Sequence, residues 1–245
     1  MKTLISAGLW ILGLAYALIF LLVALILSYL FPPKAIDPYL KRLVRGLFRV
    51  LFIRVEVRGL EGLDPDRTVI YMVNHGSLLD TPLVAGFVPG YVRGIEASQQ
   101  HRWPLYGRVM GRLGNLPIER DDVHASISTM KRAADYLDSG GSLIIFPEGH
   151  RTPSGHLLPF KKLPFHLAKR SRKPIIPLTI RGMFEINNKT SWLVRPGTVT
   201  MHFGEEISVE DAKELTTVEL RDLVEARIRG VFDEGTRNDE FGASE

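Results

Sequence analysis

The stretch TVIYMVNHGSLLD, residues 68–80, joins a short apolar run to a turn that carries a histidine and a carboxylate. The run at 68–73 is continuous and of strand length, which is typical of a strand buried on both faces of a sheet. Gly76 permits a tight turn, and Pro82 suits the first turn of a following helix. A buried strand, a turn and a helix in this order favour an α/β fold.

His75 and Asp80 are the candidate catalytic pair in this stretch. On one continuous helix, five residues would separate the two side chains by roughly 140°. They can meet if a strand ends at Val73 and a helix begins near Ser77 or Asp80. Asp80 would then hold one tautomer of His75 and leave the other ring nitrogen as a general base. Alternatively, Asp80 is only a helix N-cap and His75 an ordinary turn residue.

The rest of the chain continues the alternation of strands and helices. Alternation, with Val55 and Val57 on one face, predicts a strand at 54–58, and short apolar runs predict strands at 142–147, 174–180 and 198–204. Helical spacing predicts helices at 38–52, 123–138 and 218–233, the last capped by Thr216 and Glu219. The prolines in 174–180 indicate an edge strand or a strand end. We therefore expect a single catalytic α/β domain with a largely buried mixed sheet flanked by helices.

Residues 3–33 contain no charged side chain. A membrane-spanning helix needs about 20 apolar residues, so we expect residues 1–33 to be a helical membrane anchor. A secretory signal would have a shorter apolar core and a small-residue cleavage site. A buried helix of a soluble protein is the other alternative. The sequence leaves open whether the anchor spans the bilayer once or lies in one leaflet as a helical hairpin.

Residues 34–58 carry seven Lys or Arg side chains against Asp37 and Glu56. Positive charge beside a membrane segment predicts the cytoplasmic side and attraction to anionic lipid, so we expect a basic, amphipathic, membrane-proximal segment. The alternative is a solvated helix face. Nucleic acid is not an expected partner, because no zinc spacing or RNA-binding aromatic motif accompanies the basic composition. The absence of cysteine excludes disulfides, thiolate metal sites and cysteine nucleophiles.

Two loops carry side chains suited to an anionic ligand. FPEGHRT, 146–152, follows a predicted strand, and α/β proteins tend to bind ligands at such strand ends. Arg151 offers a planar fork for phosphate, and Gly149 lets the backbone approach a ligand. The loop at 114–122 adds Arg120 as a second possible phosphate ligand. The alternative for both loops is a surface turn with ordinary salt bridges.

Four blocks, in this order, resemble the glycerolipid acyltransferase family, which includes the 1-acyl-glycerol-3-phosphate (lysophosphatidate) acyltransferases. The blocks are NHGSLLD (74–80), GNLPIERDD (114–122), FPEGHRT (146–152) and IIPLTI (175–180). The third corresponds to the family's Phe-Pro-Glu-Gly-Thr-Arg, and LLPFKKLPFHLA (157–168) follows it as in the family. The resemblance covers approximately residues 55–205.

The resemblance implies transfer of a fatty acyl group from acyl-CoA or acyl carrier protein to the free hydroxyl of 1-acyl-glycerol-3-phosphate, giving phosphatidic acid. His75 would be the general base and Asp80 would orient it. The acceptor would be bound by Arg120, Glu148, Gly149 and Arg151. No metal and no cofactor beyond the thioester co-substrate is implied. The acyltransferase domain would occupy 59–234 on the cytoplasmic face of the membrane, followed by a frayed tail at 235–245.

Several positions depart from the family pattern. His150 replaces the usual Thr, Leu163 and Pro164 replace Gly-Ala, Ser98 stands near a frequent Lys, and LPIER replaces an aromatic-rich stretch. The acceptor could therefore be another lysophospholipid, a lyso-aminolipid or a glycolipid. A metal hydrolase using His75, Asp80, Glu148 and His150 lacks a recognisable ligand spacing. A non-catalytic lipid-binding protein is disfavoured by the intact His75 and Asp80.

Overall fold

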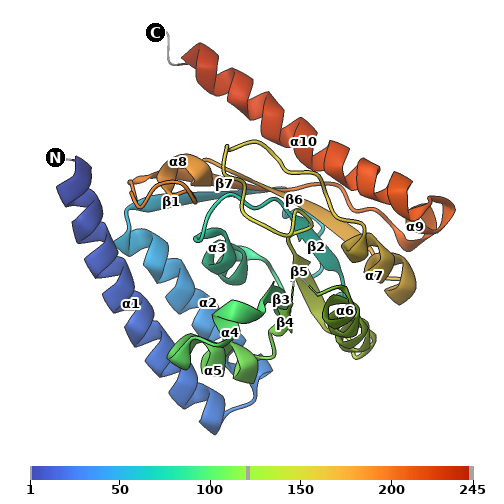
Figure 1. Cartoon of the computed structure of the whole chain (residues 1–245), viewed down its shortest axis with the longest axis horizontal. Coiled ribbons are helices and arrows are strands. Elements are labelled where there is room, and N and C mark those ends of the chain that lie inside the picture. Colours follow the sequence, from blue (N-terminus) through green and yellow to red (C-terminus); the bar gives the residue numbers. More distant parts are fainter. Residues whose placement is uncertain (1, 120–121, 243–245) are drawn as a thin grey trace.

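The computed structural model describes residues 2–119 and 122–242, and within them seven strands form one sheet. The strands are β1 (Ile53–Arg58), β2 (Ile70–Val73), β3 (Val92–Ala97), β4 (Leu116–Ile118), β5 (Ser142–Ile145), β6 (Ile175–Arg181) and β7 (Gly197–Phe203). Their order across the sheet is β1-β7-β6-β2-β5-β3-β4 (Figure 1). Only β6 and β7 pair antiparallel, so the sheet is mixed and the predicted α/β class is confirmed.

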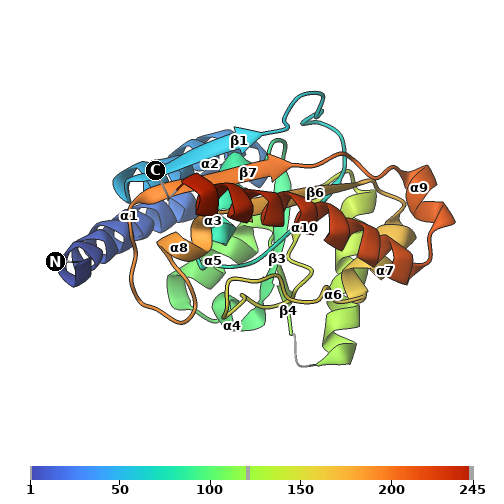
Figure 2. The same cartoon turned by 90° about the horizontal axis from the view of Figure 1, so that it is seen from above.

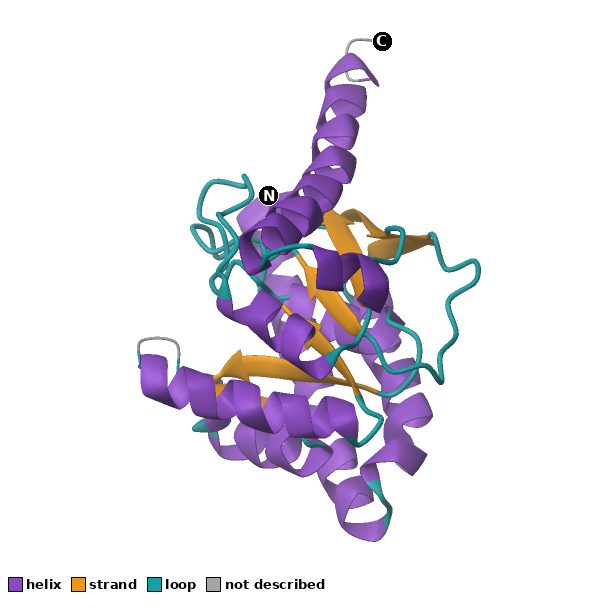
Figure 3. Ribbon diagram, turned by 90° about the vertical axis from the view of Figure 1, so that its right-hand side faces the viewer, coloured by secondary structure: helices purple, strands orange, loops and turns teal. Residues whose placement is uncertain are grey.

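Helices cover both faces of the sheet (Figure 1 and Figure 3). They are α1 (Lys2–Leu30), α2 (Pro33–Val50), α3 (Asp80–Phe87), α4 (Ser98–His101), α5 (Pro104–Leu113), α6 (Val123–Asp138), α7 (Leu163–Ser171), α8 (Met183–Ile186), α9 (Val209–Glu214) and α10 (Thr217–Gly242). Successive residues of a strand point to opposite faces. Tyr71 and Val73 accordingly share one core cluster with α2 and α3, whereas Ile70 and Met72 share another with α6, α7 and α10.

Helix α1 packs beside α2 and α5 (Figure 1 and Figure 2). Gly46 of α2 makes room for Tyr16 of α1, whose hydroxyl donates to the Leu43 carbonyl at 2.7 Å. Leu9 is buried in the core, whereas Ile11 on the outer side of α1 is 70% exposed. By length and composition, α1 is long and apolar enough to cross a membrane. The helix therefore has one face on the domain and an uncovered apolar face.

The structure adds detail at two expected boundaries. β1 pairs in parallel with β7, so residues 53–58 form a strand of the sheet, as predicted for 54–58. Helix α10 continues to Gly242, past the point at 235 where the tail is expected to fray. A single interior glycine costs a helix only about 1 kcal/mol, so Gly235 does not end it. The predicted cap of this helix is confirmed, because Thr216 and Glu219 exchange hydrogen bonds of 2.7 and 3.2 Å.

Of the two alternatives for strand 174–180, an edge strand is wrong, because β6 lies between β2 and β7 in the interior of the sheet, whereas Pro174 does lie just before the strand begins. The ladder with β7 begins at Leu178, so Pro177 needs no N–H toward that strand, and its carbonyl accepts from Gly204 N at 2.8 Å. The proline is tolerated because β7 has already ended beside it.

Candidate active site

The carboxyl ends of β2, β5 and β6 meet at one edge of the sheet because these strands are parallel neighbours. The loops that leave them begin at Asn74, Phe146 and Gly182. Antiparallel β7 starts at the same edge, so the segment before Gly197 also arrives there. Three of the four sequence blocks, far apart along the chain, are thereby brought together.

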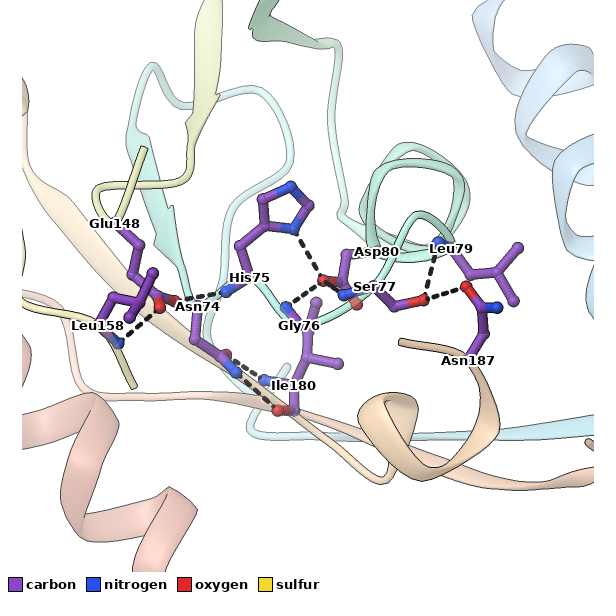
Figure 4. A network of polar contacts seen from close by, with 10 residues as sticks. All are labelled: Asn74, His75, Gly76, Ser77, Leu79, Asp80, Glu148, Leu158, Ile180 and Asn187. Carbon is purple, nitrogen blue, oxygen red and sulfur yellow. Dashed lines mark hydrogen bonds and ion pairs between the residues drawn. The ribbon is translucent and has the colours of Figure 1, made fainter. Parts of the chain in front are cut away.

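The contact predicted between His75 and Asp80 is present (Figure 4). His75 Nδ1 lies 2.9 Å from Asp80 Oδ2, and the two side chains are 9% and 1% exposed. A carboxylate in this position accepts Nδ1–H, so Nε2 carries the lone pair that a general base needs. Phe146 stacks on the imidazole with ring centroids 4.2 Å apart, which restricts the ring's rotation.

The turn after β2 has the form that Gly76 and Pro82 predict. β2 ends at Val73 and α3 begins at Asp80, with Pro82 in its first turn. Asp80 Oδ2 also accepts the backbone N–H groups of Gly76 and Ser77, each at 2.7 Å. The residue that caps α3 is Leu79, so Asp80 turns its carboxylate back toward the loop and is not a helix N-cap.

Asn74, Ser77 and Asn187 hold this turn, and sequence reasoning assigned them no role. The Asn74 amide exchanges two hydrogen bonds with the backbone of Ile180, of 2.9 and 2.7 Å. The Ser77 hydroxyl donates to Asn187 Oδ1 at 3.1 Å. Buried amides and hydroxyls need partners, but those partners lie over a hundred residues away, so no local pattern indicates them.

Glu148 links the third block to the first (Figure 4). Its Oε1 accepts His75 N at 2.6 Å, and its Oε2 accepts Leu158 N at 2.8 Å. Burial raises the pKa of Glu148 to about 7, against the two backbone hydrogen bonds, which favour the charged form. Glu148 therefore fixes the backbone of the residue that carries the imidazole.

A cavity of about 630 Å³ opens over these groups. His75, Asp80 and Glu148 line it together with Arg181 and Arg195. Residues of α8, the start of β7 and Phe232 of α10 also line it. The site thus combines a buried histidine–carboxylate pair with a hollow large enough for part of a substrate.

Among the described residues, the remaining predicted ligands do not line this cavity. Gly149 has φ +76°, and a Cβ there would lie 2.9 Å from Lys161 Cε. Gly149, the half-buried Arg151 and the exposed His150 are absent from the cavity lining. Arg120 lies outside the described residues. Ser98, near the family's frequent Lys, donates a hydrogen bond to Glu119.

No group of three or more His, Asp or Glu side chains in 2–119 and 122–242 is arranged to hold a metal ion. His75 and Asp80 already satisfy one another through Nδ1 and Oδ2. The described side chains instead support proton-transfer chemistry, in which a histidine base is oriented by a buried carboxylate.

The Acyltransferase family model matches residues 54–181. A 1-acyl-sn-glycerol-3-phosphate acyltransferase of Cocos nucifera is 34% identical over 157 residues, 63% of this chain and 51% of that protein. One of the same name from Limnanthes alba is 33% identical over 171 residues, 69% of this chain and 60% of that protein. The chain thus spans between half and three fifths of these relatives' length.

A solved structure shares the whole architecture. The crystal structure of the 1-acyl-sn-glycerophosphate acyltransferase PlsC from Thermotoga maritima superimposes with a TM-score of 0.85 and 26% identity, covering 96% of this chain and 98% of that one. The family match, the shared fold and the His75–Asp80 pair agree with one another. The chain belongs to the Acyltransferase family.

Proposed function

We propose that this chain transfers a fatty acyl group from an acyl thioester to the free hydroxyl of 1-acyl-glycerol-3-phosphate, giving phosphatidic acid. The observation that carries the proposal is the buried His75–Asp80 pair, with Nδ1 and Oδ2 2.9 Å apart at the cavity. Relatives at 33–34% identity bear the corresponding enzyme name, which supports this acceptor.

In the proposed reaction, His75 Nε2 takes the proton from the acceptor hydroxyl as its oxygen attacks the thioester carbonyl. Asp80 stabilises the imidazolium that forms. The tetrahedral intermediate collapses by breaking the C–S bond, and the departing thiolate receives the proton from His75. A thioester is already activated, so positioning and one base account for the chemistry and no metal or cofactor is invoked.

The donor in this proposal is acyl-CoA or acyl carrier protein. Arg120, Glu148, Gly149 and Arg151 are proposed to bind the phosphate and glycerol of the acceptor, as the family resemblance implies. Glu148 has both oxygens engaged by backbone N–H groups, yet each carboxylate oxygen has a second lone pair for a substrate hydroxyl. This leaves it able to position His75 and contact substrate at once.

The proposed setting is a membrane, with the catalytic domain on the cytoplasmic face. The uncovered apolar face of α1 supports membrane association. Helix α2, which packs on α1, carries the exposed basic side chains Lys34, Arg42 and Arg49, which suit anionic lipid headgroups. Both the acceptor and the product are lipids, which fits an active site attached to the bilayer.

The test is an assay of purified full-length protein in detergent micelles. Thiol release from acyl-CoA and from acyl carrier protein is followed with lysophosphatidate, with other lysophospholipids, and with lyso-aminolipid and glycolipid acceptors. The proposal expects phosphatidic acid by mass spectrometry, with the highest kcat/KM for lysophosphatidate. A higher kcat/KM for another acceptor would contradict the assignment of lysophosphatidate as the substrate. Loss of activity on addition of a metal chelator would contradict the metal-free mechanism.

A further inference from the structure

Arg195 lies where two hollows meet. Together with Pro196 it lines the catalytic cavity, and the same two residues line a second hollow of about 240 Å³. The second hollow is completed by Lys2 and Ile5 of α1 and by Val194. Arg195 is exposed. It therefore stands between the His75 cavity and the N-terminal end of the apolar helix.

Helix α1 holds the segment that carries Arg195, residues 187–196, from one side (Figure 2). Trp10 Nε1 donates to the Trp192 carbonyl at 2.5 Å, and Val194 N donates to Ser6 Oγ at 2.8 Å. Ser6 is 1% exposed, and a buried hydroxyl needs a hydrogen-bond partner. The bond to Val194 explains why a serine lies within this apolar helix. The apolar helix and the mouth of the cavity are thus coupled through hydrogen bonds.

The catalytic turn holds the same segment from the other side. Asn187 accepts the Ser77 hydroxyl at 3.1 Å and donates to the Leu193 carbonyl at 3.1 Å. The backbone N–H of Arg195 donates to the Ile186 carbonyl at 3.0 Å. Arg195 consequently starts from a backbone fixed relative to both His75 and α1, which favours a defined binding role over an incidental surface charge.

The chemistry of the acceptor matches this position. In 1-acyl-glycerol-3-phosphate the reacting hydroxyl lies between a phosphate and an acyl chain, so both must lie near His75 when it reacts. The phosphates of a coenzyme A donor are many bonds from its thioester carbon. A cation at the cavity mouth, beside an apolar helix, therefore suits the acceptor better than the donor.

We propose that Arg195 binds the acceptor phosphate at the mouth of the catalytic cavity, with the acyl chain directed toward Ile5 and the apolar surface of α1. This inference rests on the proposed function and adds a specificity-determining residue to it. Arg195 lies outside the segment 54–181 that the family model matches. Lys2, which lines the adjoining hollow, supplies a second positive charge.

The experiment compares Arg195→Ala and Arg195→Lys with Lys189→Ala in full-length protein in micelles. Lys189 is an exposed cation of the same segment that lines neither hollow, so it is the matched control. Lysophosphatidate is varied at saturating donor, and donor at saturating lysophosphatidate. We expect Arg195→Ala to lower the acceptor kcat/KM about tenfold or more, chiefly through KM, with the donor KM unchanged. Arg195→Lys should retain only part of the acceptor kcat/KM, because lysine keeps the charge but lacks the planar guanidinium that binds two phosphate oxygens.

The outcomes separate the inference from the function on which it rests. Absence of phosphatidic acid with the unmodified chain would overturn the proposed function. An active unmodified chain with Arg195→Ala indistinguishable from Lys189→Ala would overturn the inference alone. An increase in donor KM with an unchanged acceptor KM would also overturn it. Equal melting temperatures of the three variants exclude misfolding as the cause of a KM effect.

Discussion

One oxygen atom of Asp80 organises the catalytic turn. Oδ2 accepts hydrogen bonds from the His75 ring and from the backbone of Gly76 and Ser77. The other oxygen, Oδ1, is buried and has no hydrogen-bond partner within the described part of the chain. An asparagine can therefore place its carbonyl oxygen at Oδ2 and keep all three bonds while removing the charge. Asp80→Asn therefore tests the contribution of the negative charge while the hydrogen bonds of the turn are kept.

Asp80→Asn should lose nearly as much activity as His75→Ala while retaining a near-normal melting temperature. Without the carboxylate, nothing stabilises the imidazolium, and the loss should be on the order of 10² to 10⁴ in kcat. Thiol release and thermal unfolding measured on the same preparations check this. Substantial activity in His75→Ala at an unchanged melting temperature would contradict the assigned base.

Glu148→Gln should be destabilising despite its similar shape. Glu148 receives two N–H groups, whereas glutamine offers one oxygen and one NH₂, so one buried N–H would face another donor. An unsatisfied buried donor costs about 1–3 kcal/mol. Denaturant unfolding at pH 5, where Glu148 is protonated and both side chains are neutral, measures this cost, and Glu61→Gln, at an exposed turn, is the control.

The pH dependence of stability tests the raised pKa of Glu148. The folded state keeps a proton up to about pH 7 that the unfolded chain loses near 4.5. The folded state then binds more protons between these values, so this group's contribution to stability falls as the pH rises through that window, by about 3 kcal/mol at most. Glu148→Gln should abolish that contribution. An identical pH profile in the two proteins would contradict it.

At the scale of single elements, α5 contains two glycines that should respond oppositely to substitution. A Cβ on Gly107 would lie 1.8 Å from the His101 carbonyl oxygen, which is backbone and cannot move aside, whereas Gly111 has nothing within 4 Å. Gly107→Ala should lower stability by several kcal/mol or prevent folding. Gly111→Ala should raise stability by about 0.5–1 kcal/mol. Unfolding midpoints of the two variants check the pair, and equal effects would contradict the close packing of α4 on α5.

Strand β3 was not predicted from the sequence pattern. VRGIEA places Arg93 and Glu96 in a strand, where both are 5% exposed. Arg93 pairs with Asp37 at 3.3 Å, and Glu96 accepts from Tyr106 and Asn115 at 3.0 and 2.7 Å. Charged side chains normally indicate an exposed segment, and burial becomes acceptable only with these partners. Sequence reasoning therefore missed β3.

For the molecule as a whole, the two sides of α1 should respond differently to a charge. Ile11 is 70% exposed on the apolar outer face, whereas Leu9 is 4% exposed in the core. Ile11→Asp should leave the fold intact and weaken binding to anionic vesicles, because a carboxylate in the bilayer is costly. Leu9→Asp should unfold the protein. Vesicle flotation and thermal unfolding check both, and unchanged flotation of Ile11→Asp would contradict a lipid-facing surface.

The sequence by itself determined the features that depend on near neighbours. The strand before His75, the turn at Gly76, a helix starting near Ser77 or Asp80 and the cap at Thr216 were predicted from patterns a few residues long, and the structure contains all four. The His75–Asp80 contact belongs to this group, because its partners lie only five positions apart in the chain. Local sterics and hydrogen bonding favour such features, and distant partners such as Ile180 and Glu148 then fix the turn in place.

Only the tertiary structure decided which distant groups meet. Glu148 bonds to a backbone N–H 73 residues away, and Asn74 to a strand 106 residues away. Arg195 reaches the cavity because β7 runs antiparallel to β6 and so begins at the edge where β2 ends. The order and direction of strands fix these encounters. They depend on how the whole chain packs its apolar faces, which no short stretch of sequence contains.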